Sequence, residues 1–222
     1  MSGFKPSDAL VAAQCKTLAR LESISTQFNS QKGAGRFAGK VGILTGVGSL
    51  KGIGRSTAVL LAREGAKHLY VIDYNADTLP ELKQTLEARY PGTKITPIEA
   101  DAGDEAAISA VCNQAISEEG HLDLFFANAG IVGANLLQST EPDEFMEVFR
   151  VNTLRSDFLS SRSNEKLRSF VVEFSCFLAV KHASEAMKVI NKSANKLESG
   201  GSIILTASGE FQRQCIFVRS RC

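Results

Sequence analysis

A glycine-rich stretch between an apolar run and an amphipathic run is the feature that most constrains this chain. Residues 41–64 read VGILTGVGSLKGIGRSTAVLLARE. The apolar run at 41–44 predicts a buried strand, and residues 56–63 predict a helix with one apolar face. Gly46, Gly48, Gly52 and Gly54 lie between the two. Glycines let the backbone approach a pyrophosphate, and the free amides of a following helix point at it. The stretch therefore predicts the first strand–turn–helix unit of a dinucleotide-binding fold.

An acidic residue at the end of the next apolar run strengthens this interpretation. Residues 68–73 read HLYVID, and Asp73 lies 19 residues after Gly54. At this distance a carboxylate that ends the second strand can accept hydrogen bonds from the ribose hydroxyls of an adenine nucleotide. The alternative is an ordinary polar strand end, which the spacing from the glycine loop disfavours.

The alternation of predicted strands and helices continues along the chain. Strands are predicted at 95–99, 122–127 and 202–207, and helices at 79–90, 104–119 and 142–152. Pro97 in the third strand suits an edge of the sheet, because proline cannot donate to a strand ladder. Apolar residues between Leu10 and Phe28 have helical spacing, so a further helix is expected before the glycine loop.

Several motifs at consistent spacing resemble the short-chain dehydrogenase/reductase family. They are Thr45-Gly46, Gly52-Ile53-Gly54, Asp73, Asp101, Asn128-Ala129-Gly130, Asn152 and Ser208, and they extend over about residues 39–208. The resemblance implies an α/β protein, a three-layer α/β/α Rossmann fold with a doubly wound parallel sheet whose last strands are missing. It also implies hydride transfer between a nicotinamide coenzyme and a small alcohol or carbonyl substrate.

The resemblance also implies roles for individual residues. The coenzyme-binding positions are Gly46, Lys51, Gly52, Ile53, Gly54, Asp73, Tyr74, Asp101, Ala102, Asn128, Ala129 and Gly130. Ser208 matches the catalytic serine, and the backbone of Asn152 matches the position that holds a proton-relay water. Asp101 would meet the adenine ring, although it can equally be a loop acid ahead of a helix. NAD is favoured over NADP because Asp73 repels a 2′-phosphate, whereas Lys51 would suit NADP.

The chain departs from the family pattern at three places. Five residues separate Gly46 from Gly52, two more than usual, and about twenty extra residues at 155–176 follow the predicted helix. No Tyr-x-x-x-Lys motif follows Ser208, and Tyr70, Tyr74 and Tyr90 all precede it. Because that tyrosine transfers the hydroxyl proton, we expect impaired activity. The alternative is a catalytically inactive nucleotide-binding protein or a mis-spliced isoform.

Composition limits the other classes of function. A net charge of +1 favours neither nucleic acid nor an anionic membrane as a partner. Five scattered cysteines without a C-x-x-C pair predict free thiols in a reducing compartment and no metal site. A methyltransferase shares the glycine loop and the acid, but Asn128-Ala129-Gly130 and Ser208 disfavour it.

The sequence also predicts a division of the chain. Residues 1–36 are expected to form a helical extension and linker, 37–208 the coenzyme-binding domain, and 209–222 a tail outside the family pattern. The extension is expected to pack on the domain or on an oligomeric partner, since full-length relatives are implied to be homo-oligomers. We expect a cytoplasmic protein, because Asp8 and Glu22 disfavour a mitochondrial leader.

Overall fold

The structure is a computed structural model that describes residues 8–30, 33–131, 140–143, 148, 152, 174–194 and 196–206. The chain forms two compact units, residues 1–34 and residues 35–222. The first unit contains α1 (Asp8–Ser30), which confirms the helix predicted ahead of the glycine loop. Its packing against the domain or against an oligomeric partner stays a prediction.

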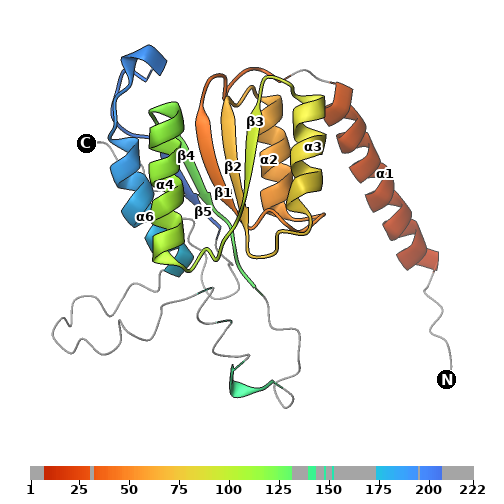
Figure 1. The fold of residues 1–222 in the computed structure, drawn as a ribbon. Helices are drawn as coiled ribbons and strands as arrows, with labels where there is room; N and C mark the ends of the chain where they lie inside the picture. The colour runs from red at the N-terminus through yellow and green to blue at the C-terminus, as the bar shows by residue number, and fades with distance from the viewer. Residues whose placement is uncertain are drawn as a thin grey trace. The chain divides into compact units, whose positions relative to one another are not determined.

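A five-stranded parallel sheet forms the centre of the second unit (Figure 1). Its strands are β1 (Val41–Thr45), β2 (His68–Asp73), β3 (Lys94–Glu99), β4 (Leu124–Ala127) and β5 (Ser202–Leu205). They are arranged in the order β3-β2-β1-β4-β5. The chain reverses direction across the sheet between β1 and β4. In doubly wound sheets, ligands bind at the carboxyl ends of the strands beside such a reversal.

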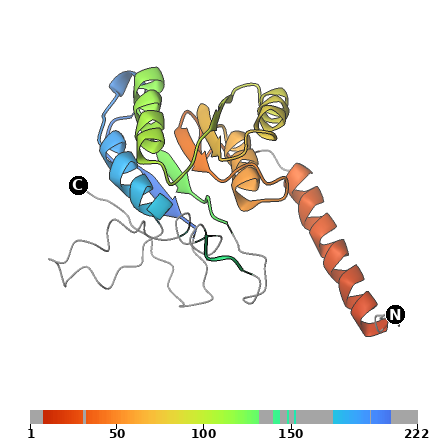
Figure 2. The ribbon, with the colours of Figure 1, turned by 60° about the horizontal axis from the view of Figure 1, so that its bottom comes forward.

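In the part of the chain that the structure describes, two helices cover each face of this sheet. On one face lie α2 (Ile53–Arg63) and α3 (Leu79–Arg89), and on the other lie α4 (Glu105–Glu119) and α6 (Phe174–Met187) (Figures 1 and 2). A short 3₁₀ helix, η4 (Lys192–Ala194), follows α6. This confirms the predicted α/β class and its three layers.

The core consists of two clusters, one on each side of the sheet. Side chains on a strand alternate between the faces. Val41 and Tyr70 therefore pack under α4 and α6, whereas Leu69 and Val71 pack under α2 and α3. Because both faces are covered, β1 is buried along its whole length, which explains its uninterrupted apolar sequence.

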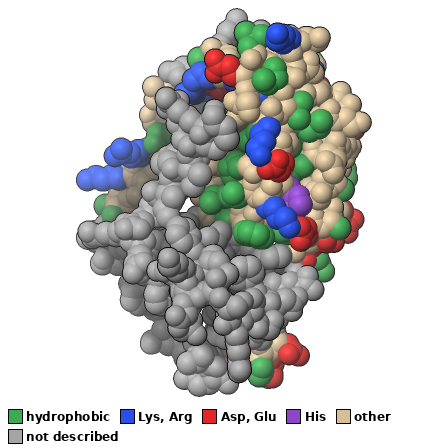
Figure 3. Space-filling model, turned by 90° about the vertical axis from the view of Figure 1, so that its left-hand side faces the viewer, with side chains coloured by type: hydrophobic (Ala, Val, Ile, Leu, Met, Phe, Trp, Pro, Cys, Tyr) green, Lys and Arg blue, Asp and Glu red, His purple; other side chains and the backbone are tan. Residues whose placement is uncertain are grey.

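The outer surface of α4 and α6 carries both polar and apolar side chains. Acidic, basic and histidine side chains lie among apolar ones on this side of the protein (Figure 3). Glu105 of α4 pairs with Lys181 and His182 of α6. These exposed ion pairs join the two helices, although pairs of this kind contribute little to stability.

The predicted elements that fall within the described residues are confirmed, with small shifts at their ends. Asp104 caps α4 through its side chain and Gly120 ends it with a φ of 75°, as their positions in the sequence indicate. The helix expected from Ser56 begins earlier, at Ile53, because Gly52 already supplies an extended N-cap. The strand expected from Leu122 begins at Leu124.

The two edges of the sheet agree with the sequence. Pro97 lies in β3, which is an edge strand, as its missing amide predicts. At the other edge β5 pairs only with β4 in the described part of the sheet, and Ile204 is 43% exposed.

Some sequence predictions fall outside the described residues. These include Ser208, the tail at 209–222, and most of both the helix at 142–152 and the insertion at 155–176. The last residues assigned to the insertion, 174–176, belong to α6. Among the helices that the structure describes, none has the length and apolarity needed to cross a bilayer.

Candidate functional site

The glycine loop joins β1 to α2 at the reversal of the sheet. β1 ends at Thr45, and Gly46 turns the chain with a φ of 71°, a conformation that favours glycine. The Gly46 amide donates to the Ile72 carbonyl at 2.9 Å, which continues the pairing of β1 with β2 beyond the strand. The loop therefore leaves the sheet between the carboxyl ends of β1, β2 and β4.

Close packing explains two of the glycines. A Cβ atom on Gly54 would lie 2.2 Å from the Gly46 carbonyl oxygen and 2.9 Å from Nδ2 of Asn128. A Cβ atom on Gly46 would lie 2.7 Å from Cα of Ala129. These contacts bring together three of the predicted motifs, the start of the loop, the start of α2 and the Asn-Ala-Gly turn.

The first turn of α2 is open to an anion. Its N-cap is Gly52, no side chain makes a capping hydrogen bond, and no acidic residue lies in the first turn. In contrast, α4 is capped by Asp104, whose carboxylate accepts from the amides of Ala106 and Ala107. Since the first amides of a helix have no partners within it, those of α2 are available to a phosphate.

Asp73 lies directly against the glycine loop. Its Oδ2 accepts the Gly48 amide at 2.7 Å, and its Oδ1 accepts the Asn75 amide at 3.1 Å. The contact arises because β1 and β2 are parallel neighbours, so their carboxyl ends meet at one edge of the sheet. The structure thus brings the predicted ribose-binding acid and the predicted pyrophosphate loop together.

Hydrogen bonds to the side chain of Thr45 join the Asn-Ala-Gly turn to β1. The buried Thr45 hydroxyl accepts the amides of Asn128 and Ala129, each at 3.0 Å. The Asn128 side chain donates to the Gly46 carbonyl at 3.1 Å and accepts the Thr206 hydroxyl at 3.0 Å. Asn128 therefore links the ends of β1, β4 and β5. The sequence marked Thr45 only as part of a motif and did not reveal this role.

Other predicted site residues surround this centre without joining it. Tyr74 and Ile53 are 75% and 63% exposed, and Lys51 is exposed as well. After β3, Asp101 accepts the Gly103 amide at 2.8 Å through Oδ1, while Ala102 is buried. Asp101 thus stabilises the turn ahead of α4, as expected if it is a loop acid. Its contact with the adenine ring stays a prediction.

Asn152 contacts the chain beyond the Asn-Ala-Gly turn. Its Oδ1 accepts the Ile131 amide at 2.9 Å, and its Nδ2 donates to the Ile131 carbonyl at 2.5 Å. The side chain therefore fixes the segment that follows Gly130. The water-holding role of the Asn152 backbone stays a prediction, as does the catalytic role of Ser208, which lies outside the described residues.

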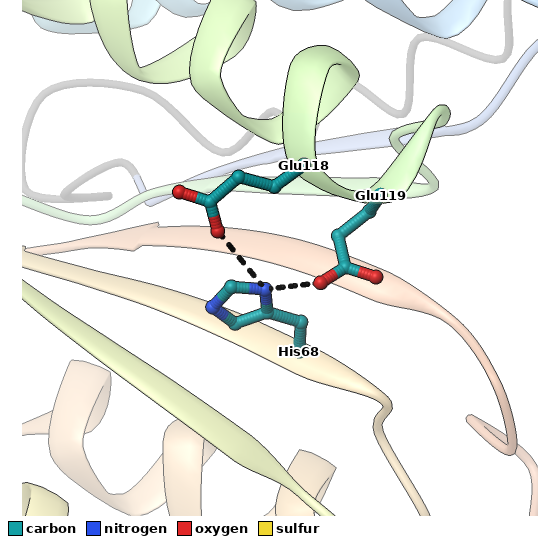
Figure 4. Close-up of side chains that lie close together, drawn as sticks. All are labelled: His68, Glu118 and Glu119. Atoms are coloured by element: carbon teal, nitrogen blue, oxygen red, sulfur yellow. Dashed lines mark hydrogen bonds and ion pairs between the residues drawn. The ribbon is translucent and has the colours of Figure 1, made fainter.

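A second polar cluster lies at the opposite ends of the strands (Figure 4). His68 begins β2, and its Nδ1 lies 2.7 Å from Oε1 of Glu119 and 3.9 Å from Oε2 of Glu118. The sequence did not reveal this cluster, because its members come from segments fifty residues apart and share no spacing pattern.

This cluster is already satisfied by its neighbours. Lys67 lies 2.7 Å from Glu119 and Lys94 lies 2.9 Å from Glu118, so two cations balance the two carboxylates. Hydrogen bonds from Gln114 and Lys94 lower the pKa of Glu118 to about 2. His68, Glu118 and Glu119 could in principle meet one metal ion, but a divalent cation would leave an uncompensated positive charge there.

Burial lowers the pKa of His68 below its ordinary value, although the hydrogen bond to Glu119 opposes the shift. Between the lowered pKa and about 6.5, the unfolded chain therefore binds more protons than the folded protein. The free energy of unfolding should fall as the pH is lowered from 7 through this window. Urea titrations at several pH values measure how the free energy of unfolding depends on pH. In His68→Asn this dependence should be weaker by at most about 1.4 kcal/mol per pH unit, which is the limit for one proton.

His182→Asn is the matched control, since it removes a histidine on the surface of α6. If the free energy of unfolding depends on pH in the same way in His68→Asn and in the unsubstituted protein, His68 is not the source of this pH dependence.

Comparisons with known proteins agree with this geometry. The family model for short chain dehydrogenases matches residues 40–164, more than half of the chain. Versicolorin reductase stcU of Emericella nidulans is 38% identical over 133 residues, which cover 60% of this chain and 49% of that protein. Levodione reductase of Leifsonia aquatica is 39% identical over 125 residues, which cover 56% of this chain and 45% of that protein.

Solved structures show the same fold. NAD+-bound xylitol dehydrogenase matches with a TM-score of 0.57 and 26% identity, covering 78% of this chain and 54% of its own. The structure of levodione reductase matches with a TM-score of 0.57 and 30% identity, covering 78% and 55%. This chain spans about half the length of the curated relatives it matches. The family model matches, the sheet is parallel, and the glycine loop packs closely against the Asn-Ala-Gly turn. On this combined evidence, the chain belongs to the short-chain dehydrogenase family.

Proposed function

We propose that this chain binds a nicotinamide adenine dinucleotide at the glycine loop, as part of an oxidoreductase of alcohols or carbonyl compounds. The observation that carries the proposal is the Asp73 carboxylate lying 2.7 Å from the Gly48 amide, beside the uncapped first turn of α2. Acceptors for ribose hydroxyls and donors for phosphates thus lie next to each other. The names of the relatives, which are reductases and dehydrogenases, support the same class of reaction.

The residues present fit such a coenzyme. The uncapped turn at Ile53 and Gly54 would hold the pyrophosphate, and Asp73 would accept the ribose hydroxyls. Asp101 and Ala102 would border the adenine ring. When bound, the nicotinamide group would supply hydride acceptance or donation. Gly46 and Asn128 keep the loop close to the sheet, so their part is to position these groups.

NAD is the proposed coenzyme rather than NADP. The Asp73 carboxylate would repel a 2′-phosphate, whereas it would accept a hydrogen bond from a 2′-hydroxyl. Lys51, directly before Gly52, favours NADP, but its side chain is exposed to solvent. Fixed acceptor geometry at Asp73 therefore supports NAD more strongly.

A second candidate is coenzyme binding without turnover by these residues. The observation that favours it is the place of the three tyrosines in this sequence, all of which precede β4. Tyr70 is buried and donates to Glu118 in the cluster beside His68, and its pKa is raised by burial. Tyr74 is exposed, and Tyr90 follows α3. Tyr90 and Lys94 have the Tyr-x-x-x-Lys spacing, but they lie between α3 and β3, ahead of β4 and β5, whereas the family motif follows Ser208.

Calorimetry on the 222-residue chain tests the proposal. NADH is expected to bind more tightly than NADPH, and S-adenosylmethionine is expected to give no heat. The oxidoreductase proposal fails if the folded chain binds neither nicotinamide coenzyme. Steady-state assays with a panel of alcohols and ketones then separate the two candidates, since measurable turnover would exclude binding alone.

Asp73→Asn tests the choice of coenzyme. The amide keeps an acceptor for Gly48 but loses the charge, so NADH should bind about tenfold more weakly, or about 1.4 kcal/mol. NADPH should bind more tightly, because the repulsion of its 2′-phosphate is removed. The control is Asp77→Asn, four residues along the same segment and exposed. An unchanged ratio of the two dissociation constants in Asp73→Asn would contradict this role.

A further inference from the structure

Thr78 stands at the N-cap of α3 but does not cap it. A threonine at this position ordinarily accepts an amide from the first turn of its helix. Here the side chain makes no capping hydrogen bond, and its hydroxyl donates instead to the Gly48 carbonyl at 2.7 Å. A proline at the start of α3 and the acidic Glu81 in its first turn favour the helix start without a side-chain cap.

Gly48 is consequently held from both sides. Its amide donates to Oδ2 of Asp73 at 2.7 Å, and its carbonyl accepts from Thr78 at 2.7 Å. A Cβ atom at this position would lie 2.8 Å from Cγ of Asp73, so the backbone approaches the carboxylate as closely as a glycine permits. Both partners belong to the segment from the end of β2 to the start of α3. The middle of the lengthened loop is thus fixed to the same segment that carries the acid.

We infer that Thr78 is a positioning residue for the coenzyme and for the choice between NAD and NADP. The inference rests on the proposed function. The Thr78 hydroxyl fixes Gly48, and the Gly48 amide in turn fixes the orientation of the Asp73 carboxylate. Without the hydroxyl, the loop and the carboxylate lose their common anchor. NADH then loses an oriented acceptor for its 2′-hydroxyl, whereas NADPH loses a repulsive neighbour.

The test compares Thr78→Val, which keeps the shape but removes the donor, with Thr78→Ser, which keeps the donor. Thr85→Val is the matched control, since Thr85 lies exposed on the same helix. Among the described residues, its hydroxyl donates a hydrogen bond to Glu81 of that helix. Calorimetry with NADH and NADPH should show about a fivefold loss of NADH affinity in Thr78→Val and a smaller ratio between the two coenzymes. Thr78→Ser and Thr85→Val should stay within about twofold of the unsubstituted protein.

Hydrogen exchange of the coenzyme-free protein gives an independent readout. The amide of Gly48 and its loop neighbours should exchange about tenfold faster in Thr78→Val and at the original rate in Thr78→Ser. Unchanged exchange, or faster exchange with an unchanged ratio of NADH to NADPH affinity, would overturn the inference. If the unsubstituted protein binds neither coenzyme, the proposed function fails and the coenzyme role of Thr78 falls with it. The exchange rates then still decide whether Thr78 holds the loop.

Discussion

Gly54→Ala should lower the free energy of unfolding by about 3 kcal/mol, the upper end of the usual cost of overpacking. The added Cβ would lie 2.2 Å from the Gly46 carbonyl oxygen, well inside van der Waals contact. The neighbouring atom belongs to the backbone of the loop, so relief requires α2 to move away from β1. Urea denaturation followed by circular dichroism measures the loss. The same variant should lose coenzyme binding, because the amides at the start of α2 would be displaced.

Gly92→Ala is the control for this substitution. Gly92 is exposed in the turn after α3, and an added Cβ would meet nothing within 4 Å. Its stability should stay within about 0.5 kcal/mol of the unsubstituted protein. Equal stabilities of the two variants would show that helix α2 and the loop are not packed as closely as described.

Thr45→Val should destabilise the protein by about 2–4 kcal/mol. Valine fills the same space, but it leaves the amides of Asn128 and Ala129 without the acceptor that they share. A buried amide that loses its partner costs about 1–3 kcal/mol, and since Asn128 and Ala129 are only half-buried, we expect the lower part of the summed range for two amides. Thr45 itself is 1% exposed, so water cannot readily replace its hydroxyl. Thermal and urea denaturation measure the effect.

Two further variants isolate the hydroxyl of Thr45. Thr45→Ser retains it and should recover most of the stability. Thr57→Val removes a hydroxyl whose hydrogen bond among the described residues is to the Ile53 carbonyl within α2, so its effect should be below about 0.5 kcal/mol. If Thr45→Val proves as stable as Thr57→Val, the Asn-Ala-Gly turn does not depend on this hydrogen bond.

Much of the fold could be predicted because each signal was local. Uninterrupted apolar runs such as 41–44 indicate strands that are covered on both faces, and the structure confirms β1 as one. Capping residues fixed the ends of α4, since Asp104 and Gly120 act on the backbone of their own helix. Pro97 indicated an edge strand for the same kind of reason, because its effect is on its own ladder.

The candidate site was only partly predictable. Gly46, Gly54 and Asp73 could be identified from spacing, since the path from one strand end to the next has a narrow range of lengths in this kind of fold. Thr45 and Thr78 could not be given their roles. A threonine hydroxyl can serve a helix cap, a strand or a loop, and nothing in its neighbours states which. Thr78 directly precedes α3, yet its hydroxyl serves the glycine loop rather than the start of that helix.

The sequence by itself determined the order of strands and helices along the chain, the glycine loop and the acid at the end of β2, because these depend on short-range backbone conformation and hydrophobic periodicity. Only the tertiary structure decided which side chains serve which backbone groups. It placed Gly48 between Asp73 and Thr78, and His68 beside Glu119 at the other end of the sheet. Such pairings follow from how β1, β2 and the helices lie side by side, and hydrogen-bond partners brought together by packing leave no periodic signal in the chain.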